Sequence, residues 1–210
     1  MSEEPGRLRA DTGRAGIVLA GGRSERFPTL DKALAPLHGQ PLIRHAVGSV
    51  APAVDEVIVN CRRDQRAALA EALEPTTVRF AVDPIPDRGA VVGLRTALAE
   101  TTATYAAVVP CDMPAMPAAF VDFLLARARN RTGAVARFAG ERRPFPMAVH
   151  VRAATAACRE TEATGEGRID AFLDRVDPEI VPERVVEAHV GPDAFRDVDT
   201  HDDLARIRDS

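Results

Sequence analysis

The chain has 210 residues with a formal net charge of −4, and 46% of its residues are hydrophobic while only 4% are aromatic. This length fits one domain, and the apolar content is sufficient for a sizeable aliphatic core. The acidic balance argues against nucleic acid as the main partner, because no basic excess is available to neutralise its phosphates.

The first predicted strand covers Ala15–Ala20, a short apolar run typical of a buried parallel strand. The polar residues before it, 1–14, are expected to form a flexible tail, and residues 15–210 are expected to form the domain. Gly21 and Gly22 follow the strand, where they permit a tight turn and a close approach of the backbone to a ligand.

Three cations follow this turn within a dozen positions: Arg23, Arg26 and Lys32. Backbone N–H groups exposed by a turn, with cations beside them, form a phosphate-binding site. Lys32 is the only lysine in the sequence. Because a lysine carries a compact charge and an arginine a broad planar one, the retained lysine favours a tight functional position.

Strands and helices then alternate with short connections. The predicted helices are 41–47, 62–73, 91–99 and 118–128, and the strands between them are 55–60, 77–82 and 104–109. Such alternation predicts an α/β fold, a single-domain, mostly parallel Rossmann-like sheet with helices on both faces. No internal repeat or linker divides the chain.

Polar groups stand at or just after the end of each of the first four predicted strands. They are the Gly21-Gly22 turn, Asn60, Asp83 and Asp112. Ligands of open parallel sheets bind at the carboxyl ends of the strands, so these four positions are expected to meet at one site. Asp and Asn are also common turn residues, which is the plainer explanation for any one of them alone.

The second half of the chain is less regular. The pattern predicts a strand pair at 134–138 and 146–151, helices at 153–161 and 169–176, and an edge strand with its turn at 180–190. Thr200 and Asp203 have the spacing of a capping box, which predicts that a last helix begins there.

The cysteines Cys61, Cys111 and Cys158 are scattered, without the spacing of a disulfide framework or a zinc site. A reducing cytoplasm is therefore the expected compartment. No apolar run approaches the length of a membrane span, so no membrane association is expected.

The segment L-A-G-G-R-S-x-R, followed after four residues by D-K-A-L, resembles the opening motif of the molybdenum cofactor guanylyltransferases. The resemblance implies that Leu19, Ala20, Gly21 and Gly22 surround the triphosphate of a nucleotide. It also implies that Lys32 and Arg26 act in catalysis at the phosphates. The family has a small, glycine-rich segment where this chain has Phe27-Pro28-Thr29-Leu30, and a proline removes an N–H donor from the loop.

Two later segments extend the resemblance. C-D-M-P at Asp112 is similar to the family's C-D-x-P, whose aspartate holds a magnesium ion, and one carboxylate beside substrate phosphates suits Mg²⁺. Asn60 and Asp83 resemble positions that contact the nucleoside, and the Asp83 carboxylate suits the N–H donors of guanine and a ribose hydroxyl equally. Asp197 and Asp199 replace the two asparagines of the family's late N-x-N-T segment, which implies acceptor binding and, for Asp199, a second metal ligand; solvated surface acids remain the alternative.

The resemblance implies a Mg²⁺-dependent transfer of GMP from GTP to the terminal phosphate of molybdopterin, with release of pyrophosphate. The expected partners are GTP, the molybdenum cofactor and the enzymes that receive it. Three alternatives stay open: a related transferase that uses CTP, one that acts on a sugar or polyol phosphate, and a non-catalytic carrier of the cofactor. A P-loop ATPase is excluded, because no Gly-Lys-Ser/Thr follows the glycines.

Overall fold

The computed structural model describes residues 13–23 and 31–208. A seven-stranded sheet crosses the molecule in the order β5-β4-β1-β6-β8-β7-β9, and a two-stranded ladder, β2-β3, lies apart from it. The strands are β1 (Arg14–Leu19), β2 (Pro36–Leu37), β3 (Gln40–Pro41), β4 (Glu56–Cys61), β5 (Arg79–Val82), β6 (Tyr105–Pro110), β7 (Gly133–Phe138), β8 (Glu141–His150) and β9 (Glu179–Val181).

The sheet is mixed but mostly parallel, as the alternating pattern predicts. β5, β4, β1 and β6 run parallel to one another, whereas β8 pairs antiparallel with both β6 and β7. The chain moves from β1 outwards through β4 to β5 and then returns to place β6 on the other side of β1. The strand order therefore reverses between β1 and β6, which is where open α/β sheets bind ligands.

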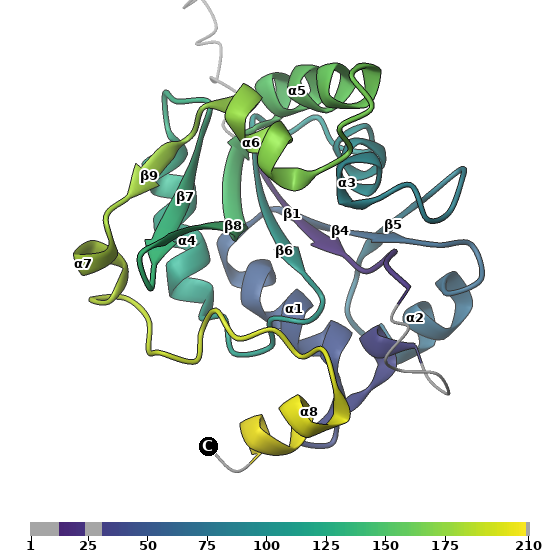
Figure 1. Cartoon of the computed structure of the whole chain (residues 1–210). Helices are drawn as coiled ribbons and strands as arrows, with labels where there is room; N and C mark the ends of the chain where they lie inside the picture. Colours follow the sequence, from purple (N-terminus) through teal and green to yellow (C-terminus); the bar gives the residue numbers. More distant parts are fainter. Residues whose placement is uncertain (1–12, 24–30, 209–210) are drawn as a thin grey trace, which may run out of the picture.

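Helices cover both faces of the sheet (Figure 1). The helical elements are η1 (Lys32–Leu34), α1 (Leu42–Val50), η2 (Ala51–Ala53), α2 (Arg66–Leu73), α3 (Ala90–Leu98), α4 (Ala118–Ala128), α5 (Val151–Ala163), α6 (Ile169–Val176), α7 (Glu183–Val186) and α8 (His201–Arg208). One buried cluster packs α1, α2 and α4 against the sheet, and a second packs α3, α5 and α6 against the opposite face. Both clusters are rich in Val, Leu, Ile and Ala, as the composition predicts.

Several predicted boundaries are wrong. The edge strand expected over 180–190 ends at Val181, because Pro182 begins the short helix α7. The helix expected from residue 62 starts at Arg66, since Arg62 and Gln65 form a turn before it. β1 begins at Arg14, one residue inside the segment expected to be a tail.

The last part of the chain returns to the middle of the molecule, where it crosses below β6 and ends in α8 (Figure 1). Val198 donates its backbone N–H to the carbonyl of Asp112 at 2.8 Å, and Leu204 packs with Leu37 and Leu42. The Thr200 hydroxyl accepts from the N–H of Asp203, and the Asp203 carboxylate accepts from the N–H of Thr200, so the predicted capping box is confirmed. This packing brings Asp199 next to β6.

In the part of the chain that the structure describes, every helix falls short of the length and apolarity that crossing a membrane requires.

Candidate active site

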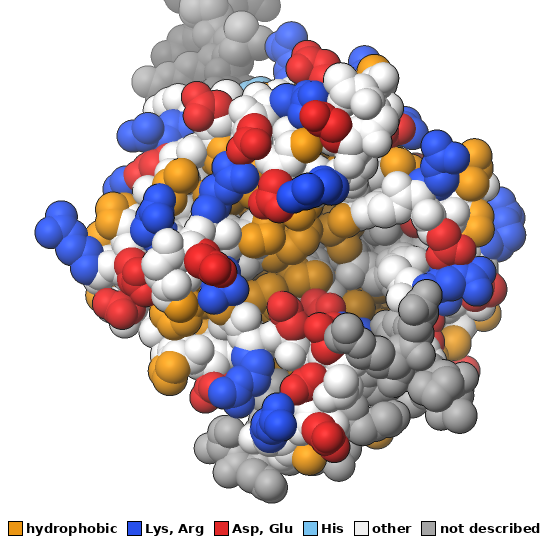
Figure 2. All heavy atoms as spheres, viewed as in Figure 1, with side chains coloured by type: hydrophobic (Ala, Val, Ile, Leu, Met, Phe, Trp, Pro, Cys, Tyr) orange, Lys and Arg blue, Asp and Glu red, His pale blue; other side chains and the backbone are white. Residues whose placement is uncertain are grey.

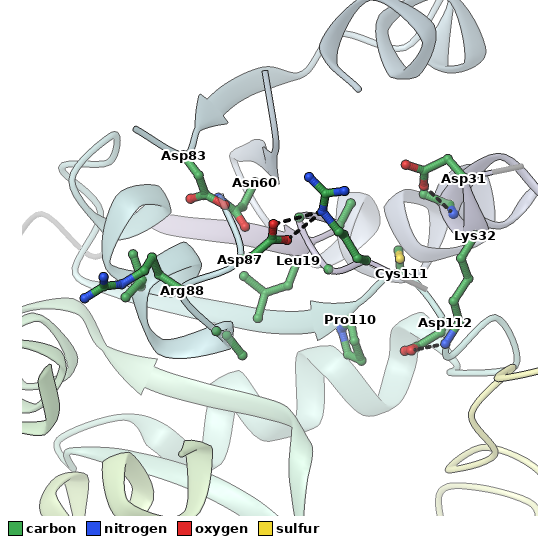
Figure 3. A pocket seen from close by; sticks show the side chains of 18 of the residues that line it. Leu19, Asp31, Lys32, Asn60, Asp83, Asp87, Arg88, Pro110, Cys111 and Asp112 are labelled. Carbon is green, nitrogen blue, oxygen red and sulfur yellow. Dashed lines mark hydrogen bonds and ion pairs between the residues drawn. The ribbon is translucent and has the colours of Figure 1, made fainter. Parts of the chain in front are cut away.

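A cavity of about 870 Å³ opens at the carboxyl ends of β1, β4, β5 and β6. Figure 2 shows apolar surface over the centre of this face with acidic side chains along its border, and Figure 3 shows the lining side chains at close range. Apart from Asp197, which does not line it, every described residue expected at the site does so. These residues are Leu19, Ala20, Gly21, Gly22, Lys32, Asn60, Asp83, Asp112 and Asp199. Arg26 and residues 27–30 lie outside the described residues.

One part of the cavity, here called the Asn60 side, is lined by Gly21, Asn60 and Asp83, and Gly93 packs against Asn60. The buried Asn60 amide donates to the Asp83 carboxylate at 2.7 Å and to the carbonyl of Ala81 at 3.2 Å. Burial raises the pKa of Asp83 in spite of the hydrogen bond from Asn60.

Two glycines allow close packing on the Asn60 side. A Cβ at Gly93 in α3 would lie 2.4 Å from Asn60 Oδ1, and a Cβ at Gly21 would lie 2.8 Å from Asp83 Oδ2. A Cβ does not approach a non-bonded atom this closely, so any larger residue would push the amide or the carboxylate aside. The Asn60 side is therefore shaped by close packing.

The opposite part of the cavity, the Lys32 side, consists of Lys32, Asp112 and Asp199, and Asp197 lies just outside it. Lys32 Nζ lies 2.6 Å from Asp112 Oδ2 (Figure 3). It also lies 2.8 Å from Asp199 Oδ1, and Lys32 is only 8% exposed. Burial alone would lower the pKa of Lys32, but the attraction of Asp112 and Asp199 outweighs it and raises the pKa. The lysine is therefore charged at neutral pH.

Asp197 lies at the margin of this acidic group. Partial desolvation, followed by repulsion from Asp112 and Asp199, raises the pKa of Asp197 to about 6. The side chain is nevertheless exposed to solvent. Protein atoms nearby reduce its hydration without burying it. The charges of Asp112 and Asp199 thus act on Asp197 although it lies outside the cavity.

The chain from Ala20 to Arg23 forms the cavity wall between the two sides. Arg23 pairs with Asp87, across the cavity mouth in the loop after β5, at 2.8 Å; both side chains are exposed. On the other side of the wall, Arg62 donates to the carbonyls of Gly21 and Gly22 at 3.2 and 2.8 Å.

Residues 16–179 match the model of the MobA-like NTP transferase domain. A protein from Haloferax mediterranei, named as a probable molybdenum cofactor guanylyltransferase, is 47% identical over 207 residues, which cover 99% of this chain and 98% of the relative. The chain belongs to the MobA-like NTP transferase family.

Solved structures share this fold. Molybdopterin-guanine dinucleotide biosynthesis protein A from Archaeoglobus fulgidus superposes with a TM-score of 0.76 at 19% identity, over 93% of this chain and 97% of that one. A manganese complex of a protein from Mycobacterium tuberculosis H37Rv superposes with a TM-score of 0.68 at 21% identity, over 95% and 100% of the two chains. The predicted α/β fold with a mostly parallel sheet is confirmed.

The donor groups of this family member suit a hard divalent cation. Asp112 and Asp199 bring carboxylate oxygens to within hydrogen-bonding distance of one point, the Lys32 ammonium. Among the described residues, no group of three or more His, Cys, Asp or Glu side chains is arranged to hold a metal ion. Two carboxylates are the number that Mg²⁺ commonly takes from a protein when phosphates and water supply its other ligands.

Some contacts at the site were not predicted from the sequence. Phe145, in β8, lines the cavity, and Gly93 lies against Asn60 from α3. Arg62 follows the predicted strand end at Asn60 by two residues, so its position at the edge could have been inferred. Gln65 and Gly93 carry no such signal, because their proximity to the site depends on how α2 and α3 pack.

Proposed function

We propose that this protein transfers GMP from GTP to the terminal phosphate of molybdopterin, or of the molybdenum cofactor, and releases pyrophosphate. The observation that carries this proposal is the meeting of the Gly21-Gly22 turn, Lys32 and Asp112 at one cavity. The name of the Haloferax mediterranei relative, which aligns over nearly the whole chain, supports the same reaction.

On this proposal, the Asn60 side binds the nucleoside. Guanine presents N1–H and N2–H₂ donors on one edge, and a carboxylate such as Asp83 accepts from both. Asn60 holds that carboxylate through its amide at 2.7 Å and so limits its orientations. Cytosine offers only one such amino donor, so the Asp83 carboxylate favours GTP over CTP.

The triphosphate then lies along residues Leu19–Gly22, between the two sides. Lys32 and Arg26 supply positive charge to the departing pyrophosphate, where charge increases in the transition state. Mg²⁺ held by Asp112 and Asp199 would screen the charges of the phosphates when it is bound.

The acceptor phosphate approaches from the Lys32 side, past Asp197, Asp199 and Phe145. One of its oxygens forms a bond to the α-phosphorus of GTP, and the bond from that phosphorus to the bridging oxygen of the β-phosphate breaks. The electron pair leaves with pyrophosphate. The acceptor oxygen is already anionic at neutral pH, so this step needs no general base.

A nucleotide panel tests the proposal. Pyrophosphate release is followed with GTP, CTP, ATP and UTP, each with Mg²⁺ and with or without molybdopterin. GTP alone should give turnover, and only when the acceptor is present. Turnover with CTP, or with a sugar or polyol phosphate as acceptor, would instead favour a related transferase, and binding of molybdopterin without pyrophosphate would favour a carrier.

Further partners and location follow from the same proposal. The dinucleotide product has to reach the enzymes that use it, so such enzymes are proposed partners. The three cysteines are free and buried, which supports a reducing compartment such as the cytoplasm.

A further inference from the structure

Three polar residues, here called the loop clamp, hold the cavity wall: Asp31, Arg62 and Gln65. Arg62 is 8% exposed and Gln65 is 4% exposed. Neither lines the cavity, although the residues from Ala20 to Arg23 that they hold do so. Arg62 and Gln65 are thus separated from any ligand by one layer of backbone, whereas Asp31 lines the cavity.

The clamp binds three successive backbone carbonyls. Gln65 Nε2 donates to the carbonyl of Ala20 at 2.9 Å, and Arg62 Nη1 donates to those of Gly21 and Gly22 at 3.2 and 2.8 Å. All three carbonyls are therefore drawn to the side of the backbone that faces away from the cavity.

The direction of these carbonyls also fixes the direction of the N–H groups that follow them. In a planar trans peptide, the C=O of one residue and the N–H of the next point in opposite directions. Carbonyls held from behind at Ala20, Gly21 and Gly22 therefore aim the N–H groups of Gly21, Gly22 and Arg23 towards the cavity. Successive N–H groups that converge in this way form an anion-binding nest.

The same clamp holds the segment that carries the lysine. Arg62 Nη2 and Gln65 Nε2 both donate to Asp31 Oδ2, at 3.2 and 2.5 Å. Asp31 Oδ1 in turn accepts from the N–H of Ala33 at 3.0 Å and so caps η1, whose first residue is Lys32. Two side chains thus connect the glycine turn to the lysine.

We propose that Arg62 and Gln65 are positioning residues that orient the N–H groups of the glycine turn, and the Lys32 segment, towards the triphosphate. This inference rests on the proposed function, because it concerns the phosphate part of that site. Arginine is required because its planar guanidinium can donate to two carbonyls and a carboxylate at once, whereas a lysine ammonium cannot span them in the same geometry.

The test measures binding of inorganic tripolyphosphate by calorimetry and binding of guanosine by NMR titration, on the full chain. The variants are Arg62→Lys and Gln65→Met, and Arg63→Lys is the matched control, because Arg63 is the exposed neighbour of Arg62. Both clamp variants should weaken tripolyphosphate binding by roughly tenfold or more, the effect of losing hydrogen bonds to a charged group. Guanosine binding should stay within about twofold for every variant, and Arg63→Lys should match the wild type.

Wild-type affinity of Arg62→Lys for tripolyphosphate would overturn the inference. Parallel loss of tripolyphosphate and guanosine binding, with a lowered melting temperature, would also overturn it, because the clamp would then only stabilise the fold. If the unaltered protein fails to bind tripolyphosphate, the proposed function itself fails, and the inference with it. That result is distinguishable, because it appears before any substitution is made.

Discussion

The two sides of the cavity are built by different means. On the Asn60 side, Gly21 and Gly93 allow neighbours to approach so closely that an added methyl group would overlap Asn60 or Asp83. On the Lys32 side, one buried ammonium lies between two carboxylates, and a third has its pKa raised to about 6. Packing determines the first side and charge determines the second.

This difference predicts different responses to substitution. A change of shape on the Asn60 side should affect both folding and nucleotide binding, because the same contacts serve both. A change of charge on the Lys32 side should affect turnover far more than folding, because Asp112 and Asp199 are partly exposed and solvent can replace part of what is lost.

The largest effect is expected for Asp112→Asn. A neutral amide is a poor ligand for Mg²⁺, so kcat should fall roughly a hundredfold or more at fixed Mg²⁺ while the melting temperature changes little. Asp122→Asn is the matched control, because Asp122 is an exposed carboxylate that pairs with Arg14, away from the cavity. A kcat within about threefold of the wild type would show that Asp112 has no part in catalysis.

Lys32→Arg should be nearly as damaging as Lys32→Ala, with a loss of roughly a hundredfold in kcat/KM. The wider guanidinium does not fit a position that is 8% exposed and lies between two carboxylates. Steady-state kinetics, with folding checked by circular dichroism, measure both variants. Near wild-type activity for Lys32→Arg would show that charge alone matters and that the compact shape of lysine does not.

An intermediate effect is expected for Gly93→Ala. The added methyl displaces the Asn60 amide, so the KM for the nucleotide should rise by roughly tenfold and the free energy of unfolding should fall by about 1–3 kcal/mol. Gly48→Ala is the control, since Gly48 also lies in a helix but has nothing within 4 Å of an added Cβ. That control should gain about 0.5–1 kcal/mol. Equal KM values for the two variants would contradict the close packing proposed for this side.

The smallest effect is expected for Asp203→Asn, which weakens the support of the segment that carries Asp199. The Thr200 hydroxyl and then the N–H groups of Asp199 and Thr200 hold the pKa of Asp203 below its ordinary value. A lowered carboxyl pKa stabilises the folded state above the pKa of the unfolded chain, and this stabilisation is lost as the pH falls through the lower value.

At pH 7, Asp203→Asn should therefore cost about 0.5–1 kcal/mol, and the difference from the wild type should disappear on acidification below about pH 4. Melting temperatures between pH 7 and pH 3 measure this, with the exposed neighbour Asp202→Asn as the control. A difference between Asp203→Asn and the wild type that does not change with pH would contradict the role of the carboxylate charge.

Much of the fold could be predicted from local patterns. The parallel strands and the helices between them repeat hydrophobic spacings that act over a few residues, and the capping box at Thr200 depends on groups three residues apart. The edge strand expected at 180–190 was wrong for a related reason. Its apolar residues are compatible with a strand or a helix. Beyond Val181 the chain is helical, because Pro182 precedes the first turn of α7 and α7 packs on β7.

The sequence by itself indicated which polar residues stand near the ends of the first four parallel strands, and therefore that Asn60, Asp83 and Asp112 would meet at one edge. The tertiary structure alone decided their partners. Asp199 reaches Lys32 across 167 positions of the chain, and Arg62 reaches the glycine turn from behind because α2 packs beside η1. Such contacts depend on how whole layers pack, and no spacing along the chain encodes a distance between elements that only the folded core brings together.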